Sequence, residues 1–333
     1  MRVAVIGTGT MGGMHARLLA GLPAVSEVLV VDADAERAAL VARDTGARVV
    51  SHDEAIDAAD AVVVATPAVL HATSVEAAVA RGVPVLCEKP LTDDLRSSAA
   101  LVARVEEAGA IVEMGFQRRH DPAFAEAHRR LASGDAGAVH LVRLTAFDPL
   151  VTPRPVTEFT PNDAAPLFLH SSVHDFDLAR WLGMGEVVEV GAHGSSRDHD
   201  RPDDVRGVET AVVTMRLANG ALAVLEATWL HPGGYDIRAE VVAERAHLVM
   251  GLGPRTPADL LDADAPAPAR QRWSGYLERF EPAYRAELEA FLAVARGERP
   301  QTSTVRDGHE ALRIAIAATR AYAEHRTVPL AEI

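Results

Sequence analysis

The chain has 333 residues, of which 48% are hydrophobic and 24% charged, so it is long enough for two domains and too apolar for a disordered protein. Its formal net charge of −14 argues against binding nucleic acid or an anionic membrane surface, because both attract basic proteins. No apolar run reaches the roughly 18 residues of a membrane span, the N-terminus leaves no room for a signal peptide, and Cys87 is the only cysteine, so we expect a soluble cytoplasmic protein.

The first third of the chain predicts short apolar strands that alternate with helices. The expected strands are Val3–Ile6, Val28–Val31, Arg48–Val50, Ala61–Ala65 and Pro84–Leu86. The expected helices between and after them are Met14–Leu22, Ala35–Asp44, Asp53–Ala58, Ser74–Arg81 and Ser97–Ala108. Continuous apolar strands alternating with amphipathic helices indicate a parallel sheet that is covered on both faces.

From about Ala138 the pattern changes to longer runs with alternating polarity. These predict strands at Val139–Ala146, Val187–Ala192, Val208–Leu217, Ala221–Trp229 and Ile237–Val242, with a helix at Val173–Leu182. Asn219-Gly220 is a strong hairpin signal between two of the runs. Pro254–Arg270 is expected to be a surface loop, followed by helices at Pro282–Ala295 and Asp307–His325 and a short strand at Val328–Leu330.

The two patterns predict an α/β protein with two domains. We expect a Rossmann NAD-binding domain over residues 1–120 and a substrate-binding and oligomerisation domain over residues 121–333. The second is an α+β domain with a large, mostly antiparallel, open sheet. The sequence leaves open whether the C-terminal helices pack back on the first domain.

A glycine-rich loop follows the first predicted strand. Gly7-Thr8-Gly9-Thr10-Met11-Gly12 is a G-x-G-x-x-G element at the start of a predicted helix, and Asp32 follows Gly12 by 20 residues, at the end of the second strand. Gly7 permits the tight turn, Gly9 lets the backbone approach a pyrophosphate, and Gly12 lets helix and strand pack closely. A carboxylate at position 32 accepts hydrogen bonds from a ribose 2′-hydroxyl and repels a 2′-phosphate, which favours NAD over NADP. The alternative is a glycine turn that binds no cofactor.

Lys89 is the only lysine among 33 basic residues, and the other 32 are arginines. A mutational bias explains the arginines, and the surviving lysine could be chance. However, Lys89 follows a predicted strand, where an open parallel sheet presents its ligand crevice. Arginine cannot replace a compact ammonium whose pKa can be adjusted, so this position favours catalysis.

Several motifs together resemble the Gfo/Idh/MocA oxidoreductase family over nearly the whole chain. Within that family the chain looks most similar to the inositol and related cyclic-polyol or sugar dehydrogenases. The motifs are the Gly7-Thr8-Gly9 loop, Ala65-Thr66-Pro67 with His71, Glu88-Lys89-Pro90, Gly115-Phe116-Gln117-Arg118-Arg119, Val173-His174-Asp175-Phe176-Asp177 and Asp307-Gly308-His309-Glu310-Ala311-Leu312.

The resemblance implies hydride transfer between NAD and a secondary hydroxyl. It implies that Lys89 hydrogen-bonds the reacting hydroxyl and that His174 takes its proton, with a cis peptide before Pro90 that aims Lys89 into the cleft. By itself, His174 would read as a capping or core histidine. The resemblance also assigns further residues to the cofactor, namely Thr10, Met11, Thr66, Pro67, His71 and Glu88, and it assigns Gln117 to the substrate.

The chain departs from the inositol dehydrogenase pattern at His170, where that pattern has an aspartate four residues before the catalytic histidine. A neutral imidazole lacks the negative field of a carboxylate, which leaves the inositol specificity and the proton relay open. His170 and His174 have the i, i+4 spacing of metal ligands, but no third ligand stands out and no metal is expected. Tyr235 is assigned to the substrate pocket, with core packing as the alternative.

Charged residues beside these motifs have less specific readings. Arg118 and Arg119 are expected to be solvated or to lie between domains. Asp175 and Asp177 are expected to act, one or both, at the helix start, where carboxylates favour the helix dipole.

Two other functions fit the same fold. One uses transient oxidation to assist elimination or glycoside cleavage, with NAD recycled. The other is an NAD(H)-binding regulatory protein without catalysis. The resemblance further implies a homodimer or homotetramer, because family members usually cover the open sheet by pairing subunits.

Overall fold

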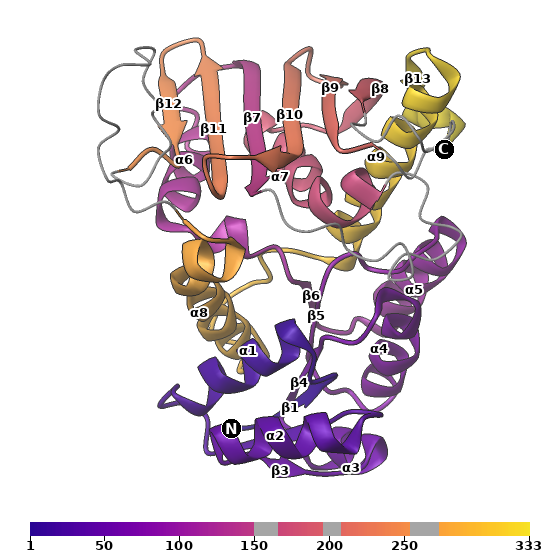
Figure 1. Ribbon diagram of the computed structural model, residues 1–333, viewed down its shortest axis with the longest axis vertical. Helices are drawn as coiled ribbons and strands as arrows, with labels where there is room; N and C mark the ends of the chain where they lie inside the picture. Colours follow the sequence, from indigo (N-terminus) through magenta and orange to yellow (C-terminus); the bar gives the residue numbers. More distant parts are fainter. Residues whose placement is uncertain (150–165, 196–207, 254–272) are drawn as a thin grey trace. The chain divides into compact units, whose positions relative to one another are not determined.

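The computed structural model describes residues 1–149, 166–195, 208–253 and 273–333, which are coloured along the chain in Figure 1. The chain forms two compact units, and each is described by itself. The first unit contains Met1–Gln117 and Ala283–Leu312, and the second contains Arg118–Pro282 and Arg313–Ile333. The loop expected at Pro254–Arg270 lies outside the described residues.

The first unit is built on a parallel sheet, as the sequence predicts, and the sheet has six strands, one more than the predicted ranges contain. The strand order is β3-β2-β1-β4-β5-β6. The strands are β1 (Arg2–Ile6), β2 (Glu27–Val31), β3 (Arg48–Val49), β4 (Ala61–Val64), β5 (Val85–Cys87) and β6 (Val112–Met114). The helices are α1 (Thr10–Ala20), α2 (Ala35–Thr45), α3 (His52–Ala58), α4 (His71–Val79) and α5 (Leu95–Ala108). This is the Rossmann arrangement.

The strand order fixes where a ligand can bind. The chain moves one way from β1 through β3 and the other way from β4 through β6, so the order reverses between β1 and β4. Right-handed crossovers then place α1 and α2 on one face of the sheet and α3 to α5 on the other, which explains why the central strands are apolar on both sides. The loops after β1 and β4 therefore flank the crevice of the sheet.

A C-terminal segment completes the edge of this sheet beside β6. Residues 301–304 run along β6, where Thr304 forms an antiparallel bridge with Glu113. The amide of Gln301 donates to Val112 O at 2.9 Å, and the Ser303 hydroxyl donates to Met114 O at 2.8 Å. The segment lies between α8 (Tyr276–Ala295) and α9 (Val305–Glu324).

The second unit is built on a seven-stranded sheet with the order β12-β11-β7-β10-β9-β8-β13. The strands are β7 (Val139–Pro149), β8 (Val187–Ser195), β9 (Thr210–Leu217), β10 (Leu222–His231), β11 (Asp236–Ala243), β12 (His247–Met250) and β13 (Val328–Pro329). Of the pairs, β7 with β10 is parallel and the others are antiparallel, so the mostly antiparallel sheet is confirmed and the sheet is mixed.

Helices α6 (Pro122–Ala132) and α7 (Val173–Gly183) pack on this second sheet (Figure 1). Helix α7 contacts β7 and β10, and α6 contacts β12. Along β9, the buried residues alternate with exposed ones, as expected for a sheet with one covered and one open face. Helix α6 and strand β12 have no counterpart among the predicted ranges.

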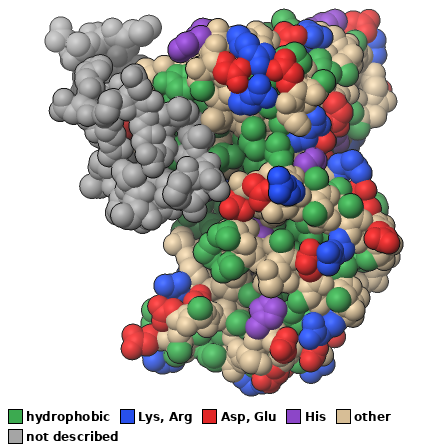
Figure 2. Space-filling model, turned by 90° about the vertical axis from the view of Figure 1, so that its right-hand side faces the viewer, with side chains coloured by type: hydrophobic (Ala, Val, Ile, Leu, Met, Phe, Trp, Pro, Cys, Tyr) green, Lys and Arg blue, Asp and Glu red, His purple; other side chains and the backbone are tan. Residues whose placement is uncertain are grey.

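The surface carries charges of both signs. Figure 2 shows acidic and basic side chains interspersed over the described part of one face. Within the described ranges, no helix is long and apolar enough to span a bilayer.

Candidate active site

The glycine loop after β1 needs glycine for different reasons at its three positions. Gly7 has a φ of +92°, and a Cβ there would lie 2.7 Å from Ala65 O. A Cβ at Gly12 would lie 1.7 Å from Gly7 O. A Cβ at Gly9 would meet no atom within 4 Å. Gly7 and Gly12 are therefore required by the fold, whereas the space beside Gly9 is left open by the protein.

This open space lies at the start of α1. Gly9 is the N-cap residue and supplies no side-chain hydrogen bond to the helix, and the first turn, which includes Thr10 and Met11, contains no acidic residue. The first N–H groups of a helix attract an anion because they lack intrahelical partners and carry a partial positive charge. An uncapped helix start beside an open glycine fits the pyrophosphate of NAD.

Asp32 follows β2 directly and is held against the glycine loop. Its Oδ2 accepts hydrogen bonds from the Thr8 backbone N–H at 2.7 Å and the Thr8 hydroxyl at 2.8 Å, and its Oδ1 accepts one from the Asp34 N–H at 2.9 Å. Burial alone would raise the pKa of Asp32, but these hydrogen bonds and the charge of Arg37 bring the pKa below its usual value. The group at this position is therefore a carboxylate, as the preference for NAD requires.

Arg37 is the basic residue beside Asp32. Its guanidinium lies 3.7 Å from Asp32 Oδ2 and donates to Asp34 Oδ2 at 3.2 Å. Because two carboxylates already share this cation, Arg37 is poorly placed to receive a 2′-phosphate. The surroundings of Asp32 thus favour a 2′-hydroxyl.

His71 joins the loop after β4 to the loop after β5. One ring nitrogen lies 2.8 Å from Thr66 O and the other 2.9 Å from Pro90 O, and the side chain is buried. Burial lowers the pKa of His71, although the backbone hydrogen bonds act in the opposite direction. His71 therefore holds Thr66 and Pro67 in place beside the Glu88-Lys89-Pro90 segment.

The Glu88-Lys89-Pro90 segment follows β5. The peptide bond between Lys89 and Pro90 is cis, as the family resemblance implies. Glu88 is buried, its Oε1 lies 2.7 Å from His15 Nε2, and its Oε2 accepts the Lys89 backbone N–H at 3.2 Å. A Cβ at Gly115 would lie 3.1 Å from Glu88 Oε2, so this glycine makes room for the carboxylate.

The charge of Glu88 is stabilised from two sides. Burial would raise its pKa, but the hydrogen bond and charge of His15 and the charge of Lys89 lower the pKa below its usual value. Lys89 itself is partly exposed. A buried carboxylate thus stands behind a lysine that remains accessible. His15 was not predicted, because nothing in its local sequence marks it as a partner of Glu88, which lies 73 residues away.

His170 and His174 lie on consecutive helical segments of the second unit. His170 is in the π-helical turn η4 (Leu167–Ser171), and His174 is the second residue of α7 and is 8% exposed. Ser172, not His174, is the N-cap residue of α7. His174 is therefore not the capping residue of α7.

The expectation that Arg118 and Arg119 are solvated is wrong. Both are buried, and each pairs with an aspartate of α7. Arg118 Nη1 donates to Asp175 Oδ1 at 2.5 Å, and Arg119 forms a two-pronged pair with Asp177, with Nε donating to Oδ2 at 2.8 Å and Nη2 donating to Oδ1. The physical reason is that the planar guanidinium matches a carboxylate and tolerates burial when paired.

These two ion pairs, which we call the arginine clamp, fix the residues after position 117 to the helix that carries His174. Asp175 and Asp177 therefore act mainly as partners of buried arginines rather than as charges at a helix start. Burial raises the pKa of Asp175, and Arg118 opposes this shift. The sequence shows the adjacent Arg118 and Arg119 and the closely spaced Asp175 and Asp177 but does not reveal their pairing.

Tyr235 and Gln117 are both buried. Tyr235 lies near Arg118, whose charge acts on its hydroxyl, and packs edge-on against Phe280 with ring centroids 6.2 Å apart. Burial raises the pKa of Tyr235. Gln117 is 2% exposed, and its Oε1 has no hydrogen-bond partner among the described residues.

The predicted site residues thus form two groups, one in each unit. The first unit brings together the glycine loop, Asp32, His71 and the Glu88–Lys89 pair, and it also contains Gln117. The second unit holds His170, His174 and Tyr235. The joint action of Lys89 and His174 on one substrate remains a prediction.

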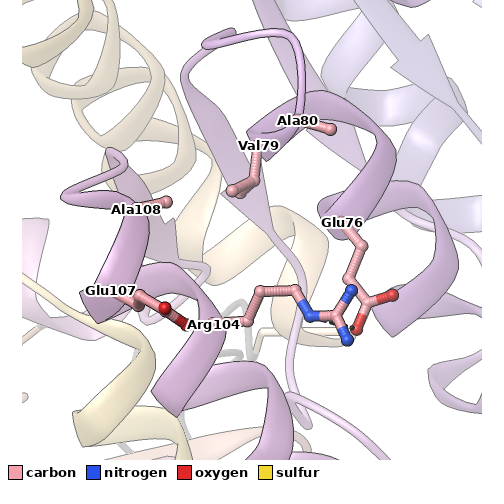
Figure 3. Close-up of a pocket in the computed structure, with 6 residues that line it drawn as sticks. All are labelled: Glu76, Val79, Ala80, Arg104, Glu107 and Ala108. Atoms are coloured by element: carbon pink, nitrogen blue, oxygen red, sulfur yellow. Dashed lines mark ion pairs between the residues drawn. The ribbon is translucent and has the colours of Figure 1, made fainter.

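A surface hollow of about 260 Å³ lies elsewhere in the first unit, between α4 and α5 (Figure 3). Its wall includes Arg104, whose Nε lies 3.3 Å from Glu76 Oε1, and the exposed Glu107. None of the predicted site residues lines it. We therefore assign no function to this hollow.

Comparison with known proteins identifies relatives along the whole chain. Residues 1–116 match the profile described as the oxidoreductase family with an NAD-binding Rossmann fold, and residues 124–249 match the profile of the GFO/IDH/MocA C-terminal domain. The myo-inositol dehydrogenase Hyg17 of Streptomyces leeuwenhoekii is 39% identical over 99% of this chain and 100% of its own length. The scyllo-inositol 2-dehydrogenase (NAD(+)) of Bacillus subtilis is 31% identical over 99% of this chain and 96% of its own length.

The fold is also shared with solved structures. The crystal structure of a putative myo-inositol dehydrogenase from Sinorhizobium meliloti superposes with a TM-score of 0.88 at 29% identity, and the match covers 99% of both chains. The relatives therefore match both the nucleotide-binding unit and the sheet of the second unit.

Proposed function

Because this chain belongs to the Gfo/Idh/MocA oxidoreductase family, we propose that it is an NAD-dependent dehydrogenase that oxidises a secondary hydroxyl of a cyclic polyol, inositol or sugar derivative. The observation that carries the proposal is the arrangement after β5, where a buried ionised Glu88 supports an accessible Lys89 in the same unit as an open glycine loop and Asp32. The relatives named as inositol dehydrogenases favour an inositol as the first substrate to test.

The chemistry needs a proton acceptor as well as a hydride acceptor. Loss of hydride from a secondary alcohol gives a carbonyl only if the hydroxyl proton also leaves. NAD supplies the hydride acceptor when it is bound. We assign the hydroxyl proton to His174, which becomes an imidazolium, while the Lys89 ammonium donates a hydrogen bond to the same oxygen and stabilises the negative charge that develops there.

Substrate recognition is assigned to residues that the sequence singled out. Gln117 has a buried amide oxygen without a partner among the described residues, so it can accept a hydrogen bond from a substrate hydroxyl. His170 stands four residues before His174 on the preceding helical turn. Tyr235, which is buried beside Arg118, is proposed to act through the arginine clamp rather than at an open pocket wall.

The same proposal includes a homo-oligomer, either a dimer or a tetramer. Its support is the open face of the second sheet, where four large apolar side chains are exposed, namely Val212, Leu222, Val242 and Val249. Ion pairs such as Arg143 with Glu240 at 3.2 Å lie among them. Mass measured by light scattering would test it, and a monomer would count against it. A cytoplasmic location fits the single, buried Cys87.

The test of the activity is NADH formation over a panel of inositols, aldoses and sugar acids, with NAD and NADP compared for each. Turnover with NAD on at least one polyol or sugar is the expected result. NADH that binds tightly without any net turnover on the panel would instead favour transient oxidation with NAD recycling, or a regulatory role.

A further inference from the structure

Glu287 on α8 is a buried carboxyl group that the proposed chemistry does not use. Its side chain is fully buried in the first unit, and neither of its carboxyl oxygens has a hydrogen-bond partner among the described residues. Removing an ionised carboxylate from water without a partner is very unfavourable, whereas the neutral acid tolerates an apolar site much better. The geometry alone therefore favours the protonated form.

The charges around Glu287 point the same way. The two charged groups that act on it are the carboxylates of Glu88 and Glu113, and both are buried. Burial first, and then these two charges, raise the pKa of Glu287 well above its usual value. Burial and these two charges therefore favour the neutral acid at this position.

Other groups nearby act on these two carboxylates. His15, from α1, and Lys89 both lower the pKa of Glu88. Burial raises the pKa of Glu113, while the Thr302 backbone N–H, which donates to Glu113 at 2.6 Å, and the charge of Arg299 oppose this rise.

Glu287 is also linked to the motif through its own helix. Tyr284, one turn earlier on α8, packs edge-on against the His15 ring with centroids 6.0 Å apart, and His15 is the partner of Glu88. Helix α8 thus carries both Tyr284, which packs on His15, and Glu287, on which the charge of Glu88 acts. The Lys89 backbone N–H in turn donates to Glu88.

We propose that Glu287 is a positioning residue of the dehydrogenase site. Because Glu287 stays protonated, Glu88 supplies the only negative charge directly behind Lys89. If Glu287 ionised, a second negative charge would repel Glu88 and strain its contact with His15. The same charge would bind the Lys89 proton more tightly. Glu287 therefore acts on Lys89 through Glu88, and this role rests on the proposed dehydrogenase function.

The protonation of Glu287 is tested by stability, without any substrate. A carboxyl whose pKa is raised in the folded state binds a proton more tightly there than in the unfolded chain, so its contribution to stability is greatest at acid pH. Between about pH 5 and the raised pKa, the factor by which this group favours the folded state in the unfolding equilibrium constant falls by about tenfold per pH unit. Glu287→Gln, which mimics the neutral acid, removes this decline. Its advantage over the wild type in denaturant unfolding should therefore grow as pH rises.

The matched control is Glu289→Gln, which removes a carboxyl from the exposed side of the same helix. The difference in stability between Glu289→Gln and the wild type should not increase as the pH rises. A flat difference for Glu287→Gln, or a loss of stability that increases with pH, would overturn the assignment of a neutral acid.

The positioning role is tested by kinetics on the best substrate of the panel. The ratio of kcat for Glu287→Gln to kcat for the wild type should rise by about tenfold between neutral and alkaline pH, because one unscreened charge near Lys89 has an effect of that order. KM should change much less than kcat, since Glu287 does not touch substrate. A ratio that stays constant with pH while the stability arm succeeds would overturn the positioning role. Failure of the dehydrogenase proposal itself would appear as absent turnover in the wild type, with the stability arm unaffected.

Discussion

His15 Nε2 lies 2.7 Å from Glu88 Oε1 in the interior of the first unit, and this contact joins the first helix of the nucleotide-binding fold to the segment that carries Lys89. The helix starts at the glycine loop, and Glu88 accepts the Lys89 backbone N–H. The cofactor loop and the proposed catalytic lysine are thus connected through two buried side chains.

Replacing His15 by alanine should therefore affect both stability and turnover. The change leaves the buried Glu88 carboxylate without its side-chain partner, which costs about 2–3 kcal/mol. We expect a lower midpoint of denaturant unfolding and a reduced kcat, because Lys89 loses its fixed support. His52→Ala, at a partly exposed histidine whose ring lies 3.2 Å from Ser74 Oγ, is the control and should cost less than about 1 kcal/mol. Equal effects of the two substitutions would contradict this account of Glu88.

Replacing glycine by alanine should have different effects at two positions of the glycine loop. Gly9→Ala should leave the stability of the protein without cofactor nearly unchanged, because its Cβ meets nothing within 4 Å, but it should weaken NADH binding. Gly12→Ala should unfold or strongly destabilise the chain, because its Cβ would lie 1.7 Å from Gly7 O. Unfolding curves and fluorescence titration with NADH distinguish the two effects. Tight NADH binding by the Gly9 variant would place the pyrophosphate elsewhere.

Asp32 should decide the choice of cofactor. Asp32→Ser removes the carboxylate that repels a 2′-phosphate and releases Arg37 from one of its two acidic neighbours. We expect KM for NAD to rise by about tenfold and measurable use of NADP to appear, in line with the loss of one charge-assisted hydrogen bond. Glu36→Ser, an exposed change on α2, should leave the preference unchanged. An unaltered NAD preference in Asp32→Ser would show that the choice is made elsewhere.

Removing one partner of an ion pair in the arginine clamp should destabilise the protein more than replacing both partners. Asp177→Asn leaves Arg119 buried without its full partner and should lower stability by about 3–5 kcal/mol. The double variant Arg119→Met with Asp177→Leu should recover much of this loss, because apolar residues of similar volume satisfy the same space. Denaturant unfolding of Arg119→Met, Asp177→Leu and the double variant gives the coupling. Simple additivity would mean that the pair contributes little to holding α7.

Features that depend on neighbouring residues could be predicted from the sequence, whereas those that depend on contacts between distant residues could not. The sequence places the glycine loop, Asp32 and Lys89 after predicted strands because local pattern and topology agree there. Strand β6 has no counterpart among the predicted ranges, since the buried Glu113 interrupts its apolar run.

The missed residues share a different cause. His15, Glu287 and the arginine clamp depend on partners brought together by the fold, and the local sequence around each resembles an ordinary helix or turn. Helix α6 differs from these, because its sequence does carry start signals, with Asp121 as the N-cap and Pro122 in the first turn. Strand β12 is only four residues long, too short for a periodic signal.

The most direct test of the central claim is net NADH formation by wild type and Lys89→Arg on the same polyol, with NADH binding measured in parallel. Arginine keeps the positive charge but not the compact ammonium, so we predict that turnover falls by about a hundredfold or more while NADH still binds. Turnover by Lys89→Arg close to that of the wild type would contradict the assignment of Lys89 to the reacting hydroxyl.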